Sequence, residues 1–357
     1  MKIKNTAALA AASCLLMANA FATTVRVHYD AGKSSIAIVG DKGPMSWSKR
    51  VAAKAGADNV WTYSWPDELG EVSMKPALGE KISTGGIYKL AAGSTIDIYP
   101  FFGAPFGKVQ LMPGIESPQL KNTRSLRIYL PPSYGENTAK RYPVLYMHDG
   151  QNLFDAKTAA YGVEWGIDET VNRLVATGVM DEVIVVGIDN TPDRIPEYTP
   201  CCDPKYGGGK LDGYEAFIVD TVKPAIDKTL RTLPGRENTA IMGSSLGGIA
   251  SVAIAQHRPE VFSKAGGVSS SFWWDNQALV KKMPKRVPVN FYIDAGTKGD
   301  GLEDTRLMRD AMLARGYLAG VDMLYYEAEG GSHNEKSWAA RVEKPLTWFF
   351  PWGGTKY

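Results

Sequence analysis

The chain has 357 residues, of which 22% are charged and 44% are hydrophobic. This composition is typical of a globular protein with a sizeable core and argues against a disordered chain. The 40 Lys and Arg residues nearly balance 38 Asp and Glu residues, a net charge of +2. Such a balance argues against nucleic acid or an anionic membrane as a partner.

Residues 1–22 have the pattern of a secretory signal peptide. Lys2 and Lys4 precede a short apolar stretch at 7–17, and Ala18-Asn19-Ala20 and Ala20-Phe21-Ala22 both offer small-residue cleavage sites. The apolar stretch is too short to span a bilayer, and nothing comparable recurs later in the chain. We therefore expect a secreted or periplasmic protein without a membrane anchor.

Residues 23–112 consist of short strand-like runs separated by Gly, Pro, Asp and Asn. Regular short strands with turn signals predict a small β-sandwich domain. The runs around Trp47, Trp61 and Gly85-Gly86-Ile87-Tyr88 resemble a starch-binding type of carbohydrate-binding module. The resemblance implies a glycan platform made by Trp47, Trp61 and Trp65. A tryptophan in a small sandwich is more often a core residue, so both interpretations stay open.

An insertion at residues 190–211 is rich in Pro, Gly and Tyr. This content predicts an irregular lid near an active site, which makes Arg194 and Tyr198 candidates for substrate contact, and a plain surface loop is the alternative. Trp273 and Trp274, further along the chain, are also candidates to line the substrate pocket. Burial in the core is the alternative for these two tryptophans.

Cys201 and Cys202 stand side by side within this insertion. In an oxidising compartment they form either a strained vicinal disulfide or two free thiols. A metal site is not expected there, because no histidine is close in the sequence. Nothing else in the chain calls for a metal or a cofactor.

Gly243-Ser244-Ser245-Leu246-Gly247 follows the apolar strand 239–242 and precedes the apolar helix 249–255. A strand, a sharp turn and a helix around G-x-S-x-G are typical of a nucleophile elbow. Small residues are needed two positions on either side of the serine, because bulk there would clash. Ser245 is therefore the candidate nucleophile. The N–H of Leu246 is a candidate donor to an oxyanion.

A second oxyanion donor is expected from a loop that follows an earlier strand. His148-Asp149-Gly150-Gln151-Asn152 follows the strand-like run 143–147. We assign the donor to the N–H of Gln151, with Gly150 allowing the close approach. Donors of this kind are worth about 3 kcal/mol each in transition-state stabilisation.

A serine nucleophile needs a base, and the chain has four histidines: His28, His148, His257 and His333. His257 falls about three turns along the elbow helix, roughly 15–18 Å from Ser245 at 1.5 Å per residue. His333 lies in a loop after the strand 322–326, where α/β-hydrolases place their histidine, last in chain order. Elimination and position together predict His333 as the base.

The acid is expected between the serine and the histidine, in the loop after the strand 287–295. Asp300 is our choice, and its role is to orient the imidazole and stabilise the imidazolium. Glu303, Asp304 and Asp294 stay as alternatives, because several carboxylates crowd this loop. The excess carboxylates are either solvated or cap the helix that follows.

Several motifs in chain order resemble the esterase D-like family, which includes enterobactin esterases, feruloyl esterases, S-formylglutathione hydrolases and mycolyltransferases. The motifs are Tyr146 to Asp155, Gly187 to Thr191, Gly243 to Gly248, Ser270 to Trp274, and Gly330 to Trp338. The resemblance covers residues 119–350 and implies an α/β-hydrolase fold with Ser245 and His333 in the catalytic roles. Many relatives carry a glutamate where this chain has Gly299, whereas mycolyltransferase-like members match Asp300. Enterobactin esterases also carry an N-terminal β-domain that helps to bind substrate.

We therefore expect a β-sandwich at 23–112 that is followed in the chain by an α/β-hydrolase domain at 113–357. The expected activity is hydrolysis of acyl or feruloyl esters of carbohydrates, or of a siderophore-type ester, through an acyl-enzyme on Ser245. One alternative is an acyltransferase that uses the same acyl-enzyme. Another is a non-catalytic glycan-binding protein on a degenerate hydrolase scaffold.

Overall fold

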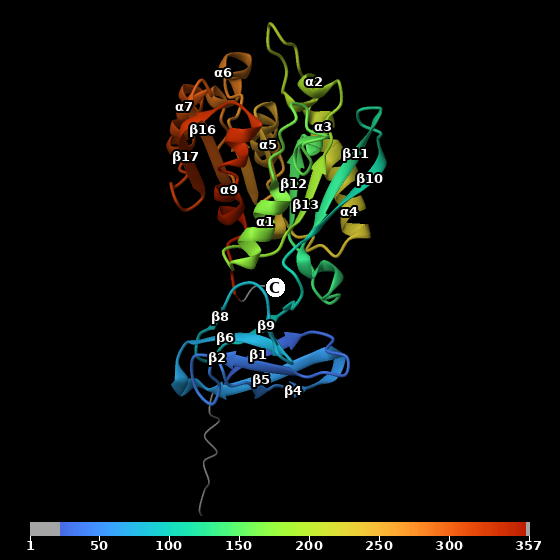
Figure 1. Ribbon diagram of the computed structural model, residues 1–357. Coiled ribbons are helices and arrows are strands. Elements are labelled where there is room, and N and C mark those ends of the chain that lie inside the picture. Colours follow the sequence, from blue (N-terminus) through green and yellow to red (C-terminus); the bar gives the residue numbers. More distant parts are fainter. Residues whose placement is uncertain (1–21, 355–357) are drawn as a thin grey trace, which may run out of the picture.

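The computed structural model describes residues 22–354. The predicted signal peptide therefore lies outside the described residues except for Ala22, which begins the first strand. Figure 1 shows a small β-domain below a larger domain in which helices flank a central sheet. Within the described residues no helix is both long enough and apolar enough to cross a membrane.

The small domain contains two β-sheets that share one core. One sheet has the order β4-β5-β1-β9, and the other has the order β3-β2-β6-β7 with β8 paired to β6. The strands are β1 (Ala22–His28), β2 (Ile36–Gly40), β3 (Val51–Ala52), β4 (Lys54–Ala55), β5 (Val60–Pro66), β6 (Val72–Leu78), β7 (Lys81–Ile82), β8 (Tyr88–Leu90) and β9 (Thr95–Ile98). Buried side chains from both sheets, among them Val25, Ile38 and Trp65, form a single hydrophobic cluster. The predicted β-sandwich is confirmed.

The structure places the domain boundary earlier than residue 112. Strand β10 (Lys108–Ser117) pairs with β11 (Asn122–Leu130) at the edge of the large sheet, whereas the last strand of the sandwich, β9, ends at Ile98. The expected boundary therefore falls inside β10. A strand pattern in the sequence shows that a segment is extended, but not which sheet it joins.

The large domain is built on an eight-stranded sheet of order β10-β11-β13-β12-β14-β15-β16-β17. The strands after β11 are β12 (Val144–His148), β13 (Ile184–Ile188), β14 (Thr239–Ser244), β15 (Lys264–Val268), β16 (Asn290–Lys298) and β17 (Met323–Ser332). The pairings from β13 to β17 are parallel, and those of β10 with β11 and β11 with β13 are antiparallel. This is the predicted α/β-hydrolase fold. The active-site loops follow the carboxyl ends of its parallel strands.

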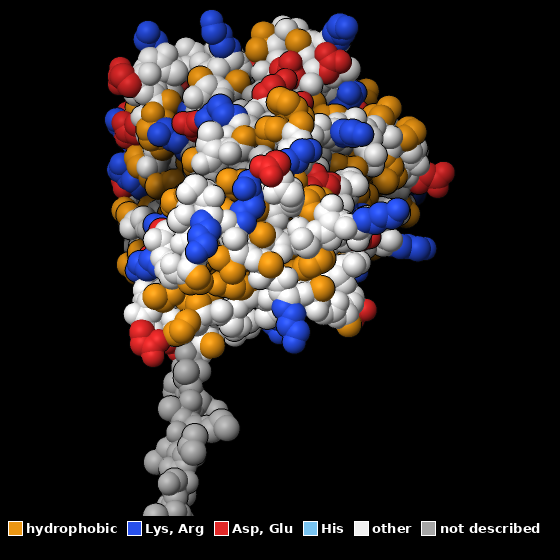
Figure 2. All heavy atoms as spheres, turned by 60° about the horizontal axis from the view of Figure 1, so that its bottom comes forward, with side chains coloured by type: hydrophobic (Ala, Val, Ile, Leu, Met, Phe, Trp, Pro, Cys, Tyr) orange, Lys and Arg blue, Asp and Glu red, His pale blue; other side chains and the backbone are white. Residues whose placement is uncertain are grey.

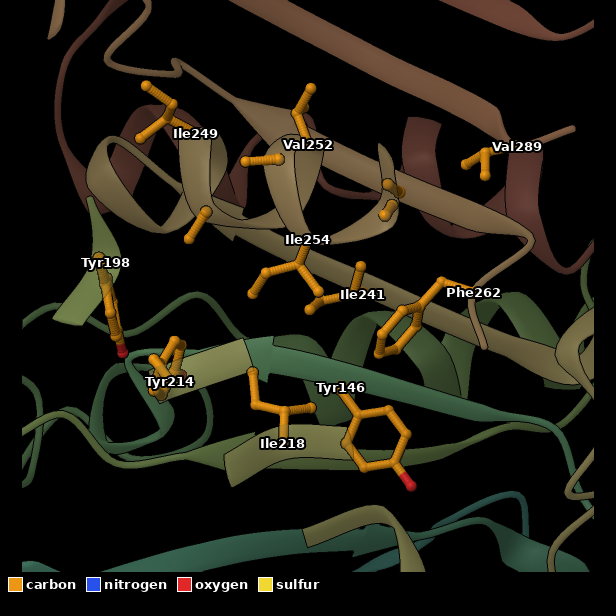
Figure 3. Packing of buried hydrophobic residues seen from close by; sticks show 14 of the residues in the cluster. Tyr146, Tyr198, Tyr214, Ile218, Ile241, Ile249, Val252, Ile254, Phe262 and Val289 are labelled. Atoms are coloured by element: carbon orange, nitrogen blue, oxygen red, sulfur yellow. The ribbon is translucent and has the colours of Figure 1, made fainter. Parts of the chain in front are cut away.

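Helices cover both faces of this sheet (Figure 1). They are α1 (Ile167–Ala176), α2 (Arg194–Tyr198), α3 (Leu211–Phe217), α4 (Lys223–Thr229), α5 (Leu246–His257), α6 (Trp274–Lys281), α7 (Leu302–Ala314), α8 (Glu335–Ala339) and α9 (Glu343–Phe349). The side chains of β12 alternate between two hydrophobic clusters. Val144 and Tyr146 belong to one cluster, and Leu145 and Met147 belong to the other. Helix α5 is buried from Leu246 to Gln256, as its mostly apolar sequence requires (Figure 3). The elbow serine is thus mounted on a rigid element.

Glu136 and Asn137 of the large domain hold the sandwich through hydrogen bonds. The Glu136 carboxylate accepts from the Tyr29 hydroxyl at 2.9 Å and from the N–H groups of Phe102 and Gly103 at 2.7 and 2.9 Å. The Asn137 amide donates to the carbonyls of His28 and Pro100, both at 2.9 Å. Two side chains therefore tie down the end of β1 and the segment that leaves the sandwich.

Candidate active site

Ser245 lies at the turn between β14 and α5 with φ 57° and ψ −120°. This left-handed backbone is unfavourable for a residue with a β-carbon and marks a strained position. The flanking glycines are required by space, because a β-carbon at Gly243 would lie 2.7 Å from His148 Cδ2 and 2.9 Å from the Gly247 backbone. The strain and the tight packing together project the Ser245 side chain out of the turn.

Ser245, His333 and Asp300 lie in one hydrogen-bonded line. The distance from Ser245 Oγ to His333 Nε2 is 3.0 Å, and that from His333 Nδ1 to Asp300 Oδ1 is 2.7 Å. His333 follows β17 directly, and Asp300 lies in the loop between β16 and α7. The geometry is that of a nucleophile, a base and an orienting carboxylate.

Asp300 is the carboxylate, among the four that the sequence offered, that lies at hydrogen-bond distance from His333. Glu303 pairs with Arg306 at 2.7 Å, and Asp304 accepts from the Gln277 amide at 2.9 Å. Asp294 is fully buried and binds Arg341. These three side chains therefore face partners other than His333.

The Asp300 carboxylate is held by several donors besides His333. The Ser269 hydroxyl donates to Oδ2 at 2.6 Å, and the Arg341 guanidinium donates to the same atom at 3.2 Å. Burial raises the pKa of Asp300, but the hydrogen bonds from His333 and Ser269 lower it more, so that its pKa lies below the usual value. Asp300 is therefore ionised at neutral pH and suited to face an imidazolium.

The loop after β12 is locked in place beside the elbow. Gln151 lies in a short 3-10 turn, Gly150–Asn152, and its side-chain oxygen accepts from the Asn190 N–H at 3.1 Å. A β-carbon at Gly150 would lie 2.5 Å from the backbone carbon of Gly187. The loop therefore packs against β13 as closely as glycine allows. The N–H of Gln151 stays the candidate partner of the Leu246 N–H.

Asp149 and Arg194 form a bidentate ion pair next to this loop, with both hydrogen bonds at 2.7 Å. Burial raises the pKa of the Asp149 carboxyl, but the guanidinium of Arg194 lowers it more, and the net pKa is below the usual value. Arg194 also lines the pocket in front of Ser245. The cation that was expected to contact substrate is thus positioned by a buried carboxylate.

A pocket of about 550 Å³ opens in front of Ser245 and His333. Its wall includes apolar side chains from the loop before α1 and from α8, namely Tyr161, Val163 and Trp338. Asn152, Asn190 and Arg194 supply polar groups to the same pocket. A concave apolar site with a few convergent polar groups is typical of a site for a small organic group.

The family model described as Putative esterase matches residues 117–347. The chain belongs to this family. It is a carboxylic ester hydrolase, in agreement with its curated relatives. The enzyme is 24% identical over 256 residues to YbbA of Bacillus subtilis, with 67% of this chain and 97% of that protein aligned.

Two further similarities concern proteins with named substrates. The esterase is 28% identical over 230 residues to an endo-1,4-beta-xylanase/feruloyl esterase of Xylanibacter ruminicola, covering 62% of this chain and 28% of that protein. The solved structure of the enterobactin esterase FES from Shigella flexneri matches with a TM-score of 0.55 at 14% identity, covering 91% of this chain and 92% of that chain. At this identity the structural likeness shows a shared fold.

Two side chains of the esterase that were expected to contact substrate are buried instead. Tyr198 is 0% exposed, and its hydroxyl accepts from the Asp149 N–H at 3.2 Å. Trp274 is 1% exposed, and its indole N–H donates to the Pro200 carbonyl at 3.1 Å. Both support loops around the site. Trp273, by contrast, is 40% exposed and lies beside His333 in a second pocket.

The tryptophans of the β-sandwich do not form the expected platform. Trp65 is a core residue, and Trp61 is half-buried with its indole N–H donating to the Tyr29 carbonyl at 3.1 Å. Trp47 is 43% exposed and lies in a groove with Trp352, near the domain boundary. Figure 2 views the molecule with this end turned forward and shows Lys and Arg side chains dispersed among hydrophobic ones.

Within residues 22–354 one group of side chains has the spacing of metal ligands, namely Glu164, Asp168 and Glu169. Burial and the hydrogen bond with Glu169 raise the pKa of Asp168 to about 7. Burial and the neighbouring carboxylates account for this shift without an ion. We assign no metal to it.

Sequence reasoning missed the groups that support Asp300. Arg341 follows α8 and donates to both Asp294 and Asp300, and the Trp338 indole donates to Ser269 Oγ at 2.8 Å. No local motif marks Arg341, because its partners lie more than 40 residues away in sequence. Asp294, a charged residue inside the otherwise apolar run 291–295 of β16, was the available signal of a buried cation partner.

Proposed function

We propose that the enzyme is a secreted or periplasmic serine esterase that cleaves acyl or feruloyl esters of carbohydrates, or a siderophore-type ester, through an acyl-enzyme on Ser245. The observation that carries this proposal is the alignment of Ser245 Oγ, His333 and Asp300 over 3.0 and 2.7 Å. A serine in this arrangement transfers its proton to the imidazole as it attacks an ester carbonyl.

In the first half of the reaction, Ser245 Oγ bonds to the carbonyl carbon while His333 Nε2 takes the serine proton. The negative charge that forms on the carbonyl oxygen is bound by the N–H groups of Leu246 and Gln151. His333 then gives the proton to the departing alcohol, and the acyl group stays on Ser245. Asp300 holds the imidazole in the required tautomer and stabilises its charged form.

In the second half, water replaces the alcohol beside His333. The imidazole takes a proton from the water as its oxygen attacks the acyl-enzyme, and Ser245 recovers its proton when the free acid leaves. The pocket in front of Ser245 supports an aromatic acyl group with polar substituents, because its wall combines the rings of Tyr161 and Trp338 with the polar groups of Asn152 and Arg194. Feruloyl and catechoyl groups both have this character.

The test is mass spectrometry of the acids released from acetylated and feruloylated plant polysaccharides and from a catecholate siderophore. We expect the wild type to release one class of acid and the Ser245→Ala protein to release none. Equal release by both proteins would overturn the assignment of the nucleophile. Release from none of the esters would overturn the proposed substrate class.

A further inference from the structure

His333 stands between two pockets. One is the pocket of about 550 Å³ in front of Ser245, and the other is a pocket of about 320 Å³ beyond the imidazole. The walls of the second pocket include Trp273, Asp300 and the loop glycines at 299 and 301. Ser271, two residues before Trp273, has its hydroxyl 3.3 Å from Ser245 Oγ. Because His333 lines both pockets, the second pocket adjoins the imidazole that contacts Ser245.

The two pockets differ in the number of large apolar side chains in their walls. The pocket in front of Ser245 has several apolar side chains, Ala160, Tyr161, Val163 and Trp338, beside polar and charged ones such as Asn152 and Arg194. In the second pocket Trp273 is the single large apolar side chain, and the remaining wall consists of Ser, Gly, Asp and His residues. An acyl group suits the first lining. The second suits a ligand that has one apolar face and a polar rim.

Trp273 extends the second pocket into an exposed aromatic surface. The Tyr206 ring is 46% exposed and lies edge-on to Trp273 with 5.7 Å between ring centroids. The buried Trp274 lies next to both rings, with its ring centroid 5.8 Å from that of Trp273 and 6.2 Å from that of Tyr206, on which it stacks. We call Tyr206 and Trp273 the aromatic ledge.

The loop that carries Tyr206 is fixed to the start of α6. Besides the Trp274–Pro200 hydrogen bond, the Asp275 N–H donates to Asp203 Oδ2 at 3.2 Å. Cys201 and Cys202 are joined by a disulfide in the same loop. The ledge is therefore a preformed surface, which lowers the entropy cost of binding a ligand.

We propose that the aromatic ledge binds a sugar ring in the alcohol half of the ester, while the acyl group occupies the pocket in front of Ser245. The inference rests on the proposed function, since His333 must protonate the leaving alcohol. The alcohol therefore lies on the side of His333, where the second pocket and the ledge are. A sugar ring matches the lining, because its C–H face packs on an aromatic ring and its hydroxyls meet polar groups. A fatty chain would find little to pack against there, because Trp273 is the one large apolar side chain in the wall of this pocket.

The test compares two esters of ferulic acid, the methyl ester and an ester to the primary hydroxyl of an arabinose-containing xylo-oligosaccharide. The measured quantity is the ratio of kcat/KM for the sugar ester to kcat/KM for the methyl ester. Trp273→Ala should lower this ratio about tenfold, the scale of removing one well-packed aromatic side chain from an interface. Tyr206→Ala should lower it in the same direction. Tyr161→Ala, which removes an exposed ring from the acyl side, should change both rates and leave the ratio within about twofold.

If the wild type cleaves both esters, an unchanged ratio in Trp273→Ala would show that the aromatic ledge does not bind the sugar. If the wild type cleaves neither ester, the proposed function fails. A binding measurement then tests separately whether the aromatic ledge binds a sugar. Saturation-transfer NMR of the free oligosaccharide on Ser245→Ala protein should then give a signal that Trp273→Ala abolishes. An absent signal, or a signal that persists in Trp273→Ala, would show that the aromatic ledge does not bind the sugar.

Discussion

The imidazole of His148 fills the space beneath Gly243, so that the end of β12 and the nucleophile turn touch. A β-carbon at position 243 would lie 2.7 Å from His148 Cδ2, and one at Gly247 would lie 3.0 Å from His148 Cβ. His148 is 2% exposed, and its Nδ1 lies 2.9 Å from the Tyr214 hydroxyl. The position of Ser245 is therefore set by a strand that precedes it by nearly 100 residues.

Gly243→Ala tests this contact. The added methyl group meets backbone atoms of Gly247 as well as His148, so that the turn must shift. We expect a loss of about 1–3 kcal/mol in the free energy of unfolding and a lower kcat. Urea denaturation and ester hydrolysis measure the two effects. Gly135→Ala is the matched control, because a β-carbon there meets nothing within 4 Å. Wild-type behaviour of Gly243→Ala would show that the turn is not tightly packed.

His148 should also make stability depend on pH. Burial lowers the pKa of His148 to about 4, from 6.5 in the unfolded chain. Between these values the unfolded chain binds the proton and the folded chain does not, so that stability falls as pH falls. The loss reaches about 3 kcal/mol at pH 4. His148→Gln should remove this contribution. The check is urea unfolding at a series of pH values, and parallel curves for the two proteins would refute it.

Asp300→Asn should separate the role of Asp300 from that of its neighbours. Asparagine keeps the shape of the side chain but presents the wrong partner to His333 Nδ1, which favours the unproductive tautomer. We expect kcat to fall by about 10⁴ at neutral pH. Asp304→Asn is the control and should stay within about twofold of wild type, because Asp304 pairs with Gln277. Equal effects of the two substitutions would contradict the assignment.

Arg341 does not contact Ser245, but it should contribute to the stability of the folded protein. Its side chain is 4% exposed and binds Asp294 and Asp300, both carboxylates with no exposed side-chain surface. Arg341→Met leaves these buried charges without a cation and should cost about 3–5 kcal/mol. Adding Asp294→Asn should recover part of this loss, which a double-mutant cycle in urea measures. Additive losses would show that the pair is not coupled.

The elbow could be predicted from the sequence because its requirements are local. Gly243 and Gly247 stand where bulk would clash, and the apolar helix after Ser245 shows a buried element. His333 could be predicted for another reason: four histidines leave few candidates for a base. In both cases the deciding information lies within a short segment or in the count of one residue type.

The residues whose location was wrongly predicted are those whose burial depends on tertiary packing. Tyr198 and Trp274 lie in loop-like sequence, yet each is buried because its polar atom finds a backbone partner in another segment. Adjacent Trp273 is exposed, and nothing in the order of the two tryptophans distinguishes them. Arg341 likewise gains its importance from partners on a distant strand and loop. Such contacts leave no periodic or spacing signal in the chain.

The most direct test of the central claim is peptide mapping of the protein after reaction with a fluorophosphonate. A serine activated by His333 should carry the phosphonyl group on Ser245, with hydrolytic activity lost in proportion to labelling. His333→Ala should prevent the labelling while leaving Ser245 in place. A label on another residue, or full loss of activity without a label on Ser245, would contradict an acyl-enzyme mechanism at this serine.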